Sequence, residues 1–396
     1  MSRNRSLART ALVASLLTCA SARAGAPASL DEMLTPHLAR HGLPALAAAV
    51  VKGGEVIAVG AVGTRRAGAQ IAVTRDDRFH LGSDTKAFTS LLAAIFVEEG
   101  KLRWDSTLAE VFPKLEAKID PGLRKATLAQ FLSHTSGIPG DNEAFKDLLG
   151  ESMLQDGNLD ELRAWLVGRW SVLPLASKPG EKFAYANINY IIAGTMLERV
   201  GGATWEELVM GRIFAPLDLR TAGFGPQASL GKIDAPVGHG EVDGKPKAFL
   251  AGPNGDNPPI LGPAGTAHMS VLDFARWAGW HAGGGRRRPE LVRPETLKTL
   301  HTPVIPMSLK EGAPGTPSAG KYALGWGEKS VPWAPEPLLF HGGSNTHNIA
   351  YIWIDTKADF AMVLLTNIGG TKADEALRAL SSELYAKFAG PGPGPL

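Results

Sequence analysis

Segments with strand character lie at both ends of this chain, and segments with helical character fill the long stretch between them. Near the N-terminus, residues 45–51 and 55–62 are apolar runs separated by a Lys-Gly-Gly turn, which predicts a β-hairpin. Near the C-terminus, residues 338–341, 348–355 and 359–366 are rich in β-branched and apolar residues, and a short turn joins the last two. Because a two-stranded hairpin is barely stable alone, we expect the two ends to share one sheet.

This distribution predicts an α+β fold, an α/β sandwich in which an antiparallel sheet of about five main strands is flanked by helices and carries an inserted, mostly helical lobe. In a chain of 396 residues we expect a single domain over residues 25–390 and a tail at 391–396. The α/β lobe should comprise about residues 25–82 plus 321–390. The helical lobe should comprise about residues 83–320.

The first 24 residues have the three parts of a secretory signal peptide. Arg3, Arg5 and Arg9 form a basic start, residues 10–22 are uncharged and mostly apolar, and Ala22-Arg23-Ala24 is a small-residue cleavage site. The apolar stretch is too short to span a bilayer as a helix. We therefore expect an exported bacterial protein, periplasmic or extracellular, and the alternative is a cytoplasmic N-terminus.

Cys19, the only cysteine, lies inside the apolar stretch. A mature chain starting near Gly25 would therefore have no disulfide and no cysteine-bound metal. Thr18 fits a lipoprotein processing site poorly, so lipid anchoring at Cys19 is only an alternative, and we expect no stable membrane insertion after signal removal. Without the four arginines before residue 25 the formal net charge of +2 becomes −2, so we expect no nucleic-acid partner.

Ser83 and Lys86 stand three residues apart at the start of a long apolar helical segment, residues 87–97. On a helix this spacing places both side chains on one face, where the lysine amine can take the proton of the serine hydroxyl. The same Ser-x-x-Lys pattern recurs at Ser229 and Ser318, but no apolar helical run follows there. Position therefore singles out Ser83 as the candidate nucleophile.

Two further stretches offer partners for this pair. Tyr185 can exchange a proton, and Asn187 can hydrogen-bond an amide of a substrate. The run His341-Gly342-Gly343-Ser344 ends a predicted strand, where its glycines would let a substrate lie along the strand edge. The backbone N–H groups of Ser344 and Ser83 would then form an oxyanion site. Each stretch also has a structural alternative, a packed loop tyrosine and a glycine-rich turn.

Taken together and in this order, these three motifs resemble those of the serine β-lactamase and penicillin-binding hydrolase superfamily. The resemblance is closest to its class C branch, which includes D-Ala-D-Ala carboxypeptidases, D-aminopeptidases and β-lactamase-fold esterases. Other segments that fit this branch, over about residues 30–385, are Leu132-Ser133-His134-Thr135-Ser136-Gly137, Pro263-Ala264-Gly265-Thr266, Tyr322-Ala323-Leu324-Gly325-Trp326-Gly327 and Val363-Leu364-Leu365-Thr366-Asn367. The resemblance implies a β-lactamase/transpeptidase-like fold and a serine hydrolase that needs no cofactor and no metal.

The resemblance also implies a role for each matching residue. Ser83 would be the nucleophile, Lys86 its proton acceptor, and Tyr185 a general base or acid shared with Lys86. Asn187 would bind the amide of a small-molecule or short-peptide substrate, and the residues that would contact the substrate or the oxyanion are His341, Gly342, Gly343 and Ser344. An acyl-enzyme would form on Ser83 and then be hydrolysed.

The third motif departs from the Lys-Thr-Gly of class C β-lactamases, because His341 and Gly342 replace the lysine and the threonine. Histidine is mostly neutral at pH 7, so a permanent cation for the carboxylate of a β-lactam is lost, while Gly342 would make room for a bulkier substrate. We therefore expect an esterase or a D-amino-acid peptidase. The alternatives are a true class C β-lactamase and a catalytically silent penicillin-binding-like or scaffold protein.

If His341 recognises a carboxylate, Michaelis constants for anionic substrates should rise between about pH 5.5 and 7.5.

Other catalytic and metal-binding interpretations find less support in the sequence. The Gly-x-Ser-x-Gly nucleophile elbow of α/β-hydrolases is disfavoured, because Leu81 and Thr85 occupy the positions where that motif requires glycine. We expect His134 to be structural. The sequence does not predict the oligomeric state.

Overall fold

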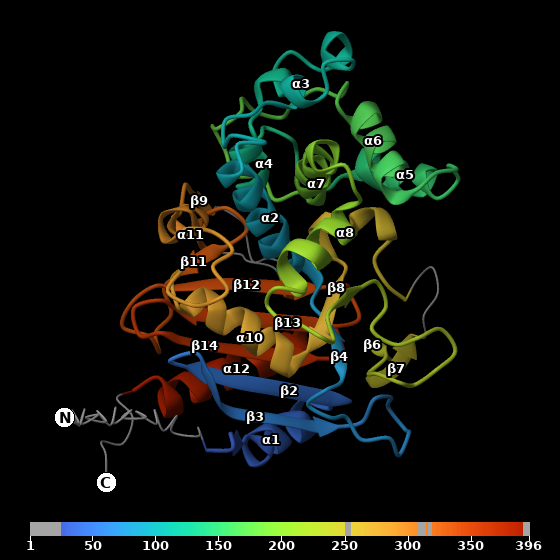
Figure 1. The fold of residues 1–396 in the computed structure, drawn as a ribbon. Helices are drawn as coiled ribbons and strands as arrows, with labels where there is room; N and C mark the ends of the chain where they lie inside the picture. The colour runs from blue at the N-terminus through green and yellow to red at the C-terminus, as the bar shows by residue number, and fades with distance from the viewer. Residues whose placement is uncertain (1–24, 250–254, 308–313, 316–318, 391–396) are drawn as a thin grey trace, which may run out of the picture.

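A sheet of nine strands forms the centre of the protein, and both ends of the chain contribute to it (Figure 1). The computed structural model describes residues 25–249, 255–307, 314–315 and 319–390. In spatial order the strands are β1 (Ala28–Ser29), β3 (Glu55–Gly63), β2 (Ala45–Lys52), β14 (Phe360–Thr366), β13 (Ile349–Asp355), β12 (Leu338–Ser344), β11 (Gly327–Lys329), β10 (Gly320–Tyr322) and β9 (Ile305–Met307). Only the β1–β3 pair is parallel within this sheet.

The predicted α+β fold with one sheet from both termini is confirmed, but the expected number of about five main strands is too small. The five predicted strands are β3, β2, β14, β13 and β12, which lie side by side in the middle. The added strands, β1, β11, β10 and β9, are two or three residues long. Such short strands contain too few residues to show an alternating pattern.

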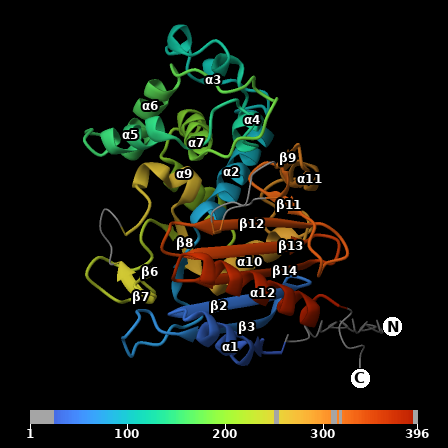
Figure 2. The same ribbon diagram turned by 180° about the vertical axis from the view of Figure 1, so that it is seen from behind.

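Both faces of the sheet are buried, because helices cover each of them. α1 (Asp31–His41) and α12 (Thr371–Phe388) pack on one face, and α10 (Val271–Ala282) packs on the other (Figures 1 and 2). Along β2, the side chains of Leu46, Ala48 and Val50 join the cluster under α1 and α12, while the alternate residues join the larger cluster on the α10 side. Strands buried on both faces are continuously apolar, which explains why the central strands are the ones that the sequence predicts.

The helical lobe lies beyond the β12 side of the sheet (Figure 1). Its helices are α2 (Lys86–Glu98), α3 (Leu108–Val111), α4 (Leu128–Leu132), α5 (Glu143–Ser152), α6 (Leu159–Trp170), α7 (Asn187–Gly201), α8 (Trp205–Val209) and α9 (Gly262–Gly265). α2 and α7 are buried along most of their length and form its core. α10 and β9, which fall within the predicted helical lobe of residues 83–320, lie on or in the sheet, and α11 (Pro294–His301) contacts α2.

Two small sheets lie beside the main one. The first contains β4 (Arg78–His80), β8 (Ala267–Ser270) and β5 (Gly223–Phe224), and the second is the hairpin of β6 (Gly238–Val242) and β7 (Lys245–Phe249). Among the helices of the described ranges, none combines the length and the apolar character needed to cross a bilayer. The predicted signal peptide with Cys19, the tail at residues 391–396 and the pattern serine at 318 lie outside the described residues.

Candidate active site

Ser83 lies in a single turn of 3-10 helix, Gly82–Thr85, between the end of β4 and the start of α2 at Lys86. The sequence predicted Ser83 on the first helical turn, and the structure places it in this tighter turn instead. Two hydrogen bonds hold the turn: the Thr85 hydroxyl donates to the Gly82 carbonyl at 2.6 Å and accepts from the Ala267 N–H at 3.0 Å. The turn is therefore tied to β8, and the partly exposed Ser83 side chain is presented at a defined point.

Lys86 is fully buried, and its amine has three neighbours. Nζ donates to Asn187 Oδ1 and to the Ala264 carbonyl, both at 2.8 Å, and it lies 3.1 Å from Ser83 Oγ. Burial lowers the pKa of Lys86 to about 7, although the negative charge of Asp141 partly opposes this decrease. A neutral amine has two N–H groups and one lone pair. Since two carbonyl oxygens occupy the N–H groups, the lone pair faces the Ser83 hydroxyl.

Asn187 is held in the orientation that this arrangement requires. Asp141 accepts hydrogen bonds from the backbone N–H of Asn187 at 2.8 Å and from its Nδ2 at 2.6 Å. Because Nδ2 is the donor to a carboxylate, Oδ1 is the atom that faces Lys86. The sequence predicted a contact of Asn187 with a substrate. The structure adds a contact that the sequence did not predict, between Asn187 and Lys86.

The Tyr185 hydroxyl lies in the same cluster and is buried. The Lys86 Nζ lies 4.9 Å from the centre of the Tyr185 ring, and the His134 ring packs against that ring at 4.3 Å between centroids. Burial raises the pKa of the Tyr185 hydroxyl far above its usual range, and its interaction with Ser83 offsets only part of this increase. A tyrosine that stays neutral at pH 7 is suited to donate a proton. The base role is therefore better matched by Lys86.

His341 is fully buried next to the turn that carries Ser83. Its Nε2 accepts from the Tyr322 hydroxyl at 3.0 Å, and its Nδ1 donates to the Gly342 carbonyl at 2.9 Å and lies 3.3 Å from Asp84 Oδ1. Burial lowers the pKa of His341 to about 3, with the Lys86 charge acting in the same direction. Burial therefore opposes the protonation of His341 between pH 5.5 and 7.5, on which the expected rise of the Michaelis constants for anionic substrates depends.

The two glycines of the third motif face opposite sides of β12. A Cβ on Gly343 would lie 1.8 Å from the Leu81 carbonyl oxygen and 2.7 Å from the Ser83 nitrogen, so only glycine allows β12 to approach the Ser83 turn this closely. A Cβ on Gly342 would instead meet the Gly315 carbonyl oxygen at 2.6 Å. The free space at Gly342 that was expected to admit a bulkier substrate is thus occupied by the chain itself.

Ser344 comes close to the Ser83 turn from the strand side. A Cβ on Gly82, which has a φ of +51°, would lie 2.2 Å from the Ser344 nitrogen. The structure therefore brings together the two backbone segments expected to supply the oxyanion N–H groups. Of the predicted site residues, Ser83, Lys86, Tyr185, Asn187, His341, Gly343 and Ser344 all lie at this junction.

Sequence reasoning missed Asp84, which lies between Ser83 and Lys86. Its side chain is buried, neither carboxyl oxygen has a hydrogen-bond partner among the described residues, and burial raises the pKa of the carboxyl well above its usual range. Asp84 occupies a variable position of the Ser-x-x-Lys pattern, so no sequence signal marked it. The Ala264 carbonyl was also missed, because a backbone acceptor leaves no trace in residue identity, although Pro263-Ala264-Gly265-Thr266 was noted as a matching segment.

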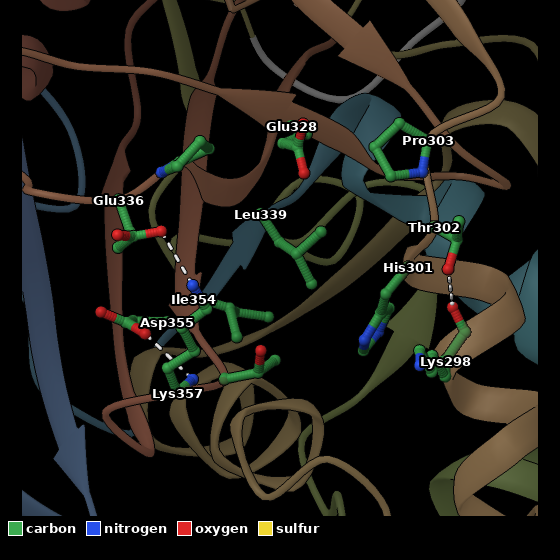
Figure 3. Close-up of a pocket in the computed structure, with 12 residues that line it drawn as sticks. Lys298, His301, Thr302, Pro303, Glu328, Glu336, Leu339, Ile354, Asp355 and Lys357 are labelled. Carbon is green, nitrogen blue, oxygen red and sulfur yellow. Dashed lines mark hydrogen bonds and ion pairs between the residues drawn. The ribbon is translucent and has the colours of Figure 1, made fainter.

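A separate cavity of about 420 Å³ lies between α11 and residues of β11, β12 and β13 (Figure 3). Lys298 and His301 line it from α11, and on the facing side the Lys357 amine donates to Glu336 at 2.8 Å. None of the predicted site residues lines this cavity. Its charged groups already pair with each other in part, and it contains no serine that would resemble the Ser83 site.

The fold is that of the β-lactamase class of hydrolases. The sequence matches the family described as Beta-lactamase over residues 30–387, so the chain belongs to this family. Penicillin-binding protein 4 of Amycolatopsis lactamdurans is 27% identical over 354 residues, which cover 88% of this chain and 87% of that protein.

Two solved structures show the likeness in three dimensions. The D-amino acid amidase of Ochrobactrum anthropi superposes with a TM-score of 0.69 at 19% identity, over 90% of this chain and 96% of that one. A class C β-lactamase superposes with a TM-score of 0.70 at 16% identity, over 91% of this chain and 96% of that one. At such low identity these two structures support the fold and not a particular substrate.

Proposed function

We propose that this protein is a serine hydrolase that forms an acyl-enzyme on Ser83 with amide or ester substrates. The observation that carries the proposal is the Lys86 amine, whose two N–H groups are taken by Asn187 and Ala264 and whose lone pair faces Ser83 Oγ at 3.1 Å. With a pKa of about 7, a large fraction of Lys86 is neutral at neutral pH and able to accept a proton.

In the proposed reaction, Ser83 Oγ attacks the carbonyl carbon of the substrate as its proton moves to Lys86 Nζ. The backbone N–H groups of Ser83 and Ser344 stabilise the resulting oxyanion. Tyr185, which is neutral, donates its proton to the leaving amine or alcohol and regains one from Lys86. Water then attacks the carbonyl carbon of the acyl-enzyme and gives up a proton to the same pair. As the bond to Ser83 Oγ breaks, the pair returns that proton to Oγ, which releases the acid and restores the Ser83 hydroxyl.

The chemistry around His341 bears on the substrate. His341 stands where class C β-lactamases have a lysine, and its buried ring is neutral and bonded on both sides, so it offers no positive charge to a substrate carboxylate. We therefore propose ester or D-amino-acid amide hydrolysis ahead of β-lactam hydrolysis. β-Lactam hydrolysis, as in a true class C β-lactamase, is the alternative activity.

A turnover screen with labelling tests the proposal. Nitrocefin, short-chain p-nitrophenyl esters and D-amino-acid amides are offered to the wild type, Ser83→Ala and Ser229→Ala, and a fluorophosphonate probe is mapped by mass spectrometry. We expect turnover and labelling at Ser83 in the wild type, loss of at least about 1,000-fold in Ser83→Ala, and no change in Ser229→Ala, which removes the serine of a matching Ser-x-x-Lys pattern. Labelling that persists in Ser83→Ala would contradict the nucleophile, and an unlabelled wild type would indicate a silent binding protein.

We also propose that the protein is exported. The proposal rests on the basic, apolar and small-residue parts of residues 1–24.

A further inference from the structure

A chain of buried polar side chains connects the two backbone segments that flank the proposed oxyanion site. His80 ends β4, Asn345 follows β12, and Asp256 lies in the loop before α9. Asp256 Oδ1 is 2.9 Å from His80 Nε2 and accepts a hydrogen bond from Asn345 Nδ2 at 2.8 Å. The His80 side chain is completely buried, and the side chains of Asp256 and Asn345 are nearly so.

The hydrogen bonds determine the tautomer of His80. Its Nδ1 accepts from the backbone N–H of Gly82 at 3.0 Å, so Nδ1 carries no proton. The proton of the neutral ring is then on Nε2, which faces Asp256. His80 therefore transmits the position of Asp256 directly to Gly82, the residue before Ser83.

The orientation of Asn345, at the other end of this row of buried polar side chains, is also fixed by hydrogen bonds. Asn345 follows Ser344, and its Oδ1 accepts from Asn348 Nδ2 at 2.9 Å and from the backbone N–H of His347 at 3.2 Å. Asn345 therefore has one orientation, with its amide group toward Asp256. Asp256 Oδ1 thus accepts a hydrogen bond from Asn345, the residue after Ser344, and lies 2.9 Å from the Nε2 of His80, three residues before Ser83.

The residue after Asp256 extends this connection to the lysine. Asn257 Nδ2 donates to the Gly265 carbonyl at 2.7 Å, and the neighbouring Ala264 carbonyl is the acceptor for Lys86. The Asp256-Asn257 pair therefore contacts His80 just before the turn, Asn345 just after β12, and Gly265 at the end of α9.

We propose that Asp256 is a positioning residue that sets the spacing between the N–H groups of Ser83 and Ser344. This inference rests on the proposed function, in which those groups hold the oxyanion. Such donors are effective only at about 2.7–3.1 Å from the oxyanion, and loss of one donor lowers kcat by about 10²–10³-fold. Without the carboxylate, the buried Asn345 amide would lose its acceptor and the buried His80 ring would lose its carboxylate neighbour, so the turn and the strand end would separate.

The test compares two substitutions in the full chain. Asp256→Leu removes the acceptor of Asn345 and the carboxylate beside His80, and we expect kcat to fall about 10–100-fold with KM within about twofold of the wild type. Asp256→Asn keeps a carbonyl oxygen at the same place, and we expect it to retain kcat within about fivefold. A phenylboronic acid, which mimics the tetrahedral adduct on Ser83, should bind more weakly to Asp256→Leu by the same factor as kcat/KM falls.

The matched control is Asp77→Leu. Asp77 is another buried carboxylate, and it pairs with Arg65 at 2.7 Å just before β4, at the end of that strand opposite to Ser83. We expect Asp77→Leu to lower the melting temperature while kcat stays within about twofold. If Asp256→Leu fails to fold, Asn345→Ala tests the role of Asp256 instead, because it removes only the donor on the β12 side. We expect Asn345→Ala to lower kcat by about tenfold.

The outcomes separate the two proposals. A folded Asp256→Leu or Asn345→Ala variant with unchanged kcat and boronate affinity, while wild type is labelled at Ser83, overturns the role of Asp256 and leaves the proposed function intact. An effect on KM alone also overturns it. Failure of the wild type to react at Ser83 overturns the proposed function itself.

Discussion

At the scale of single residues, the protonation state of Lys86 decides whether the Ser83 site can work. The lysine is surrounded by two carbonyl acceptors and one hydroxyl, and it has no counter-ion in direct contact among the described residues. Burial therefore dominates and lowers its pKa to about 7. A lysine that titrates near neutral pH is matched to proton transfer, since its basic form is available at the working pH.

This pKa predicts the acidic limb of the pH profile. Lys86 accepts a proton only when it is neutral, so kcat/KM should fall about tenfold per pH unit below about pH 7 and level off above it. The negative charge of Asp141 raises the pKa of Lys86, so Asp141→Asn should move this limb to lower pH. Steady-state rates between pH 5 and 9 provide the measurement.

Asp147→Asn is the control for the change of charge, because Asp147 is an exposed residue of the nearby helix α5. Its profile should match that of the wild type. If kcat/KM of the wild type does not change between pH 5.5 and 8, Lys86 is not the base. If the acidic limb of Asp141→Asn moves to higher pH, the electrostatic explanation is contradicted.

At the scale of elements, a buried ion cluster connects the helical lobe to the segment that supports Lys86. Arg163 on α6 is fully buried, contacts Glu198 on α7 and Glu206 on α8 at 2.5 Å each, and donates to the Ile260 carbonyl at 3.1 Å. Ile260 lies just before α9, whose Ala264 carbonyl accepts from Lys86. Three helices thus hold the loop that orients the lysine.

Replacing Arg163 should therefore affect both stability and activity. Arg163→Met leaves two carboxylates without their cation, and we expect a loss of about 3–5 kcal/mol in the free energy of unfolding. Arg169→Met on the same helix removes an exposed pair with Glu151 and should cost less than about 1 kcal/mol. Urea unfolding measures both, and similar losses in the two variants would contradict the role of burial.

At the scale of the whole molecule, the central sheet closes only when both ends of the chain are present. β14 pairs with β2 along its whole length, so Phe360 lies beside Lys52 and Thr366 beside Leu46. Contacts of such large sequence separation form late, because a long loop must close first. A chain that crosses a membrane before it folds would therefore remain unpaired until its C-terminal strands arrive.

Expression in a bacterial host with the natural N-terminus tests the proposed export. The first strand begins at Ala28, after the expected cleavage site, so removal of residues 1–24 leaves the sheet complete. We expect the mature protein in the periplasm or medium, with Gly25 as its first residue by mass spectrometry. A variant with glutamate at Arg3, Arg5 and Arg9 should stay in the cytoplasm at full length. Full-length wild-type protein in the cytoplasm would contradict export.

The amino-acid sequence alone predicted the features that depend on local pattern. The central strands are long apolar runs, and the helix after Ser83 is continuously apolar, so the sequence alone shows where these elements lie. The short edge strands were missed because two or three residues carry no period. The three motifs were likewise found by residue type and order, which also identified the superfamily.

Tertiary structure decided what each residue of those motifs does. The pKa of Lys86, the neutral state of His341 and the tautomer of His80 all depend on neighbours that are distant in sequence. The same holds for Gly342, whose space is filled by Gly315, and for Asp256, which no motif marks. Burial and hydrogen bonding are properties of the folded environment, so the sequence determined the chemical groups of the site and only the fold determined their protonation and direction.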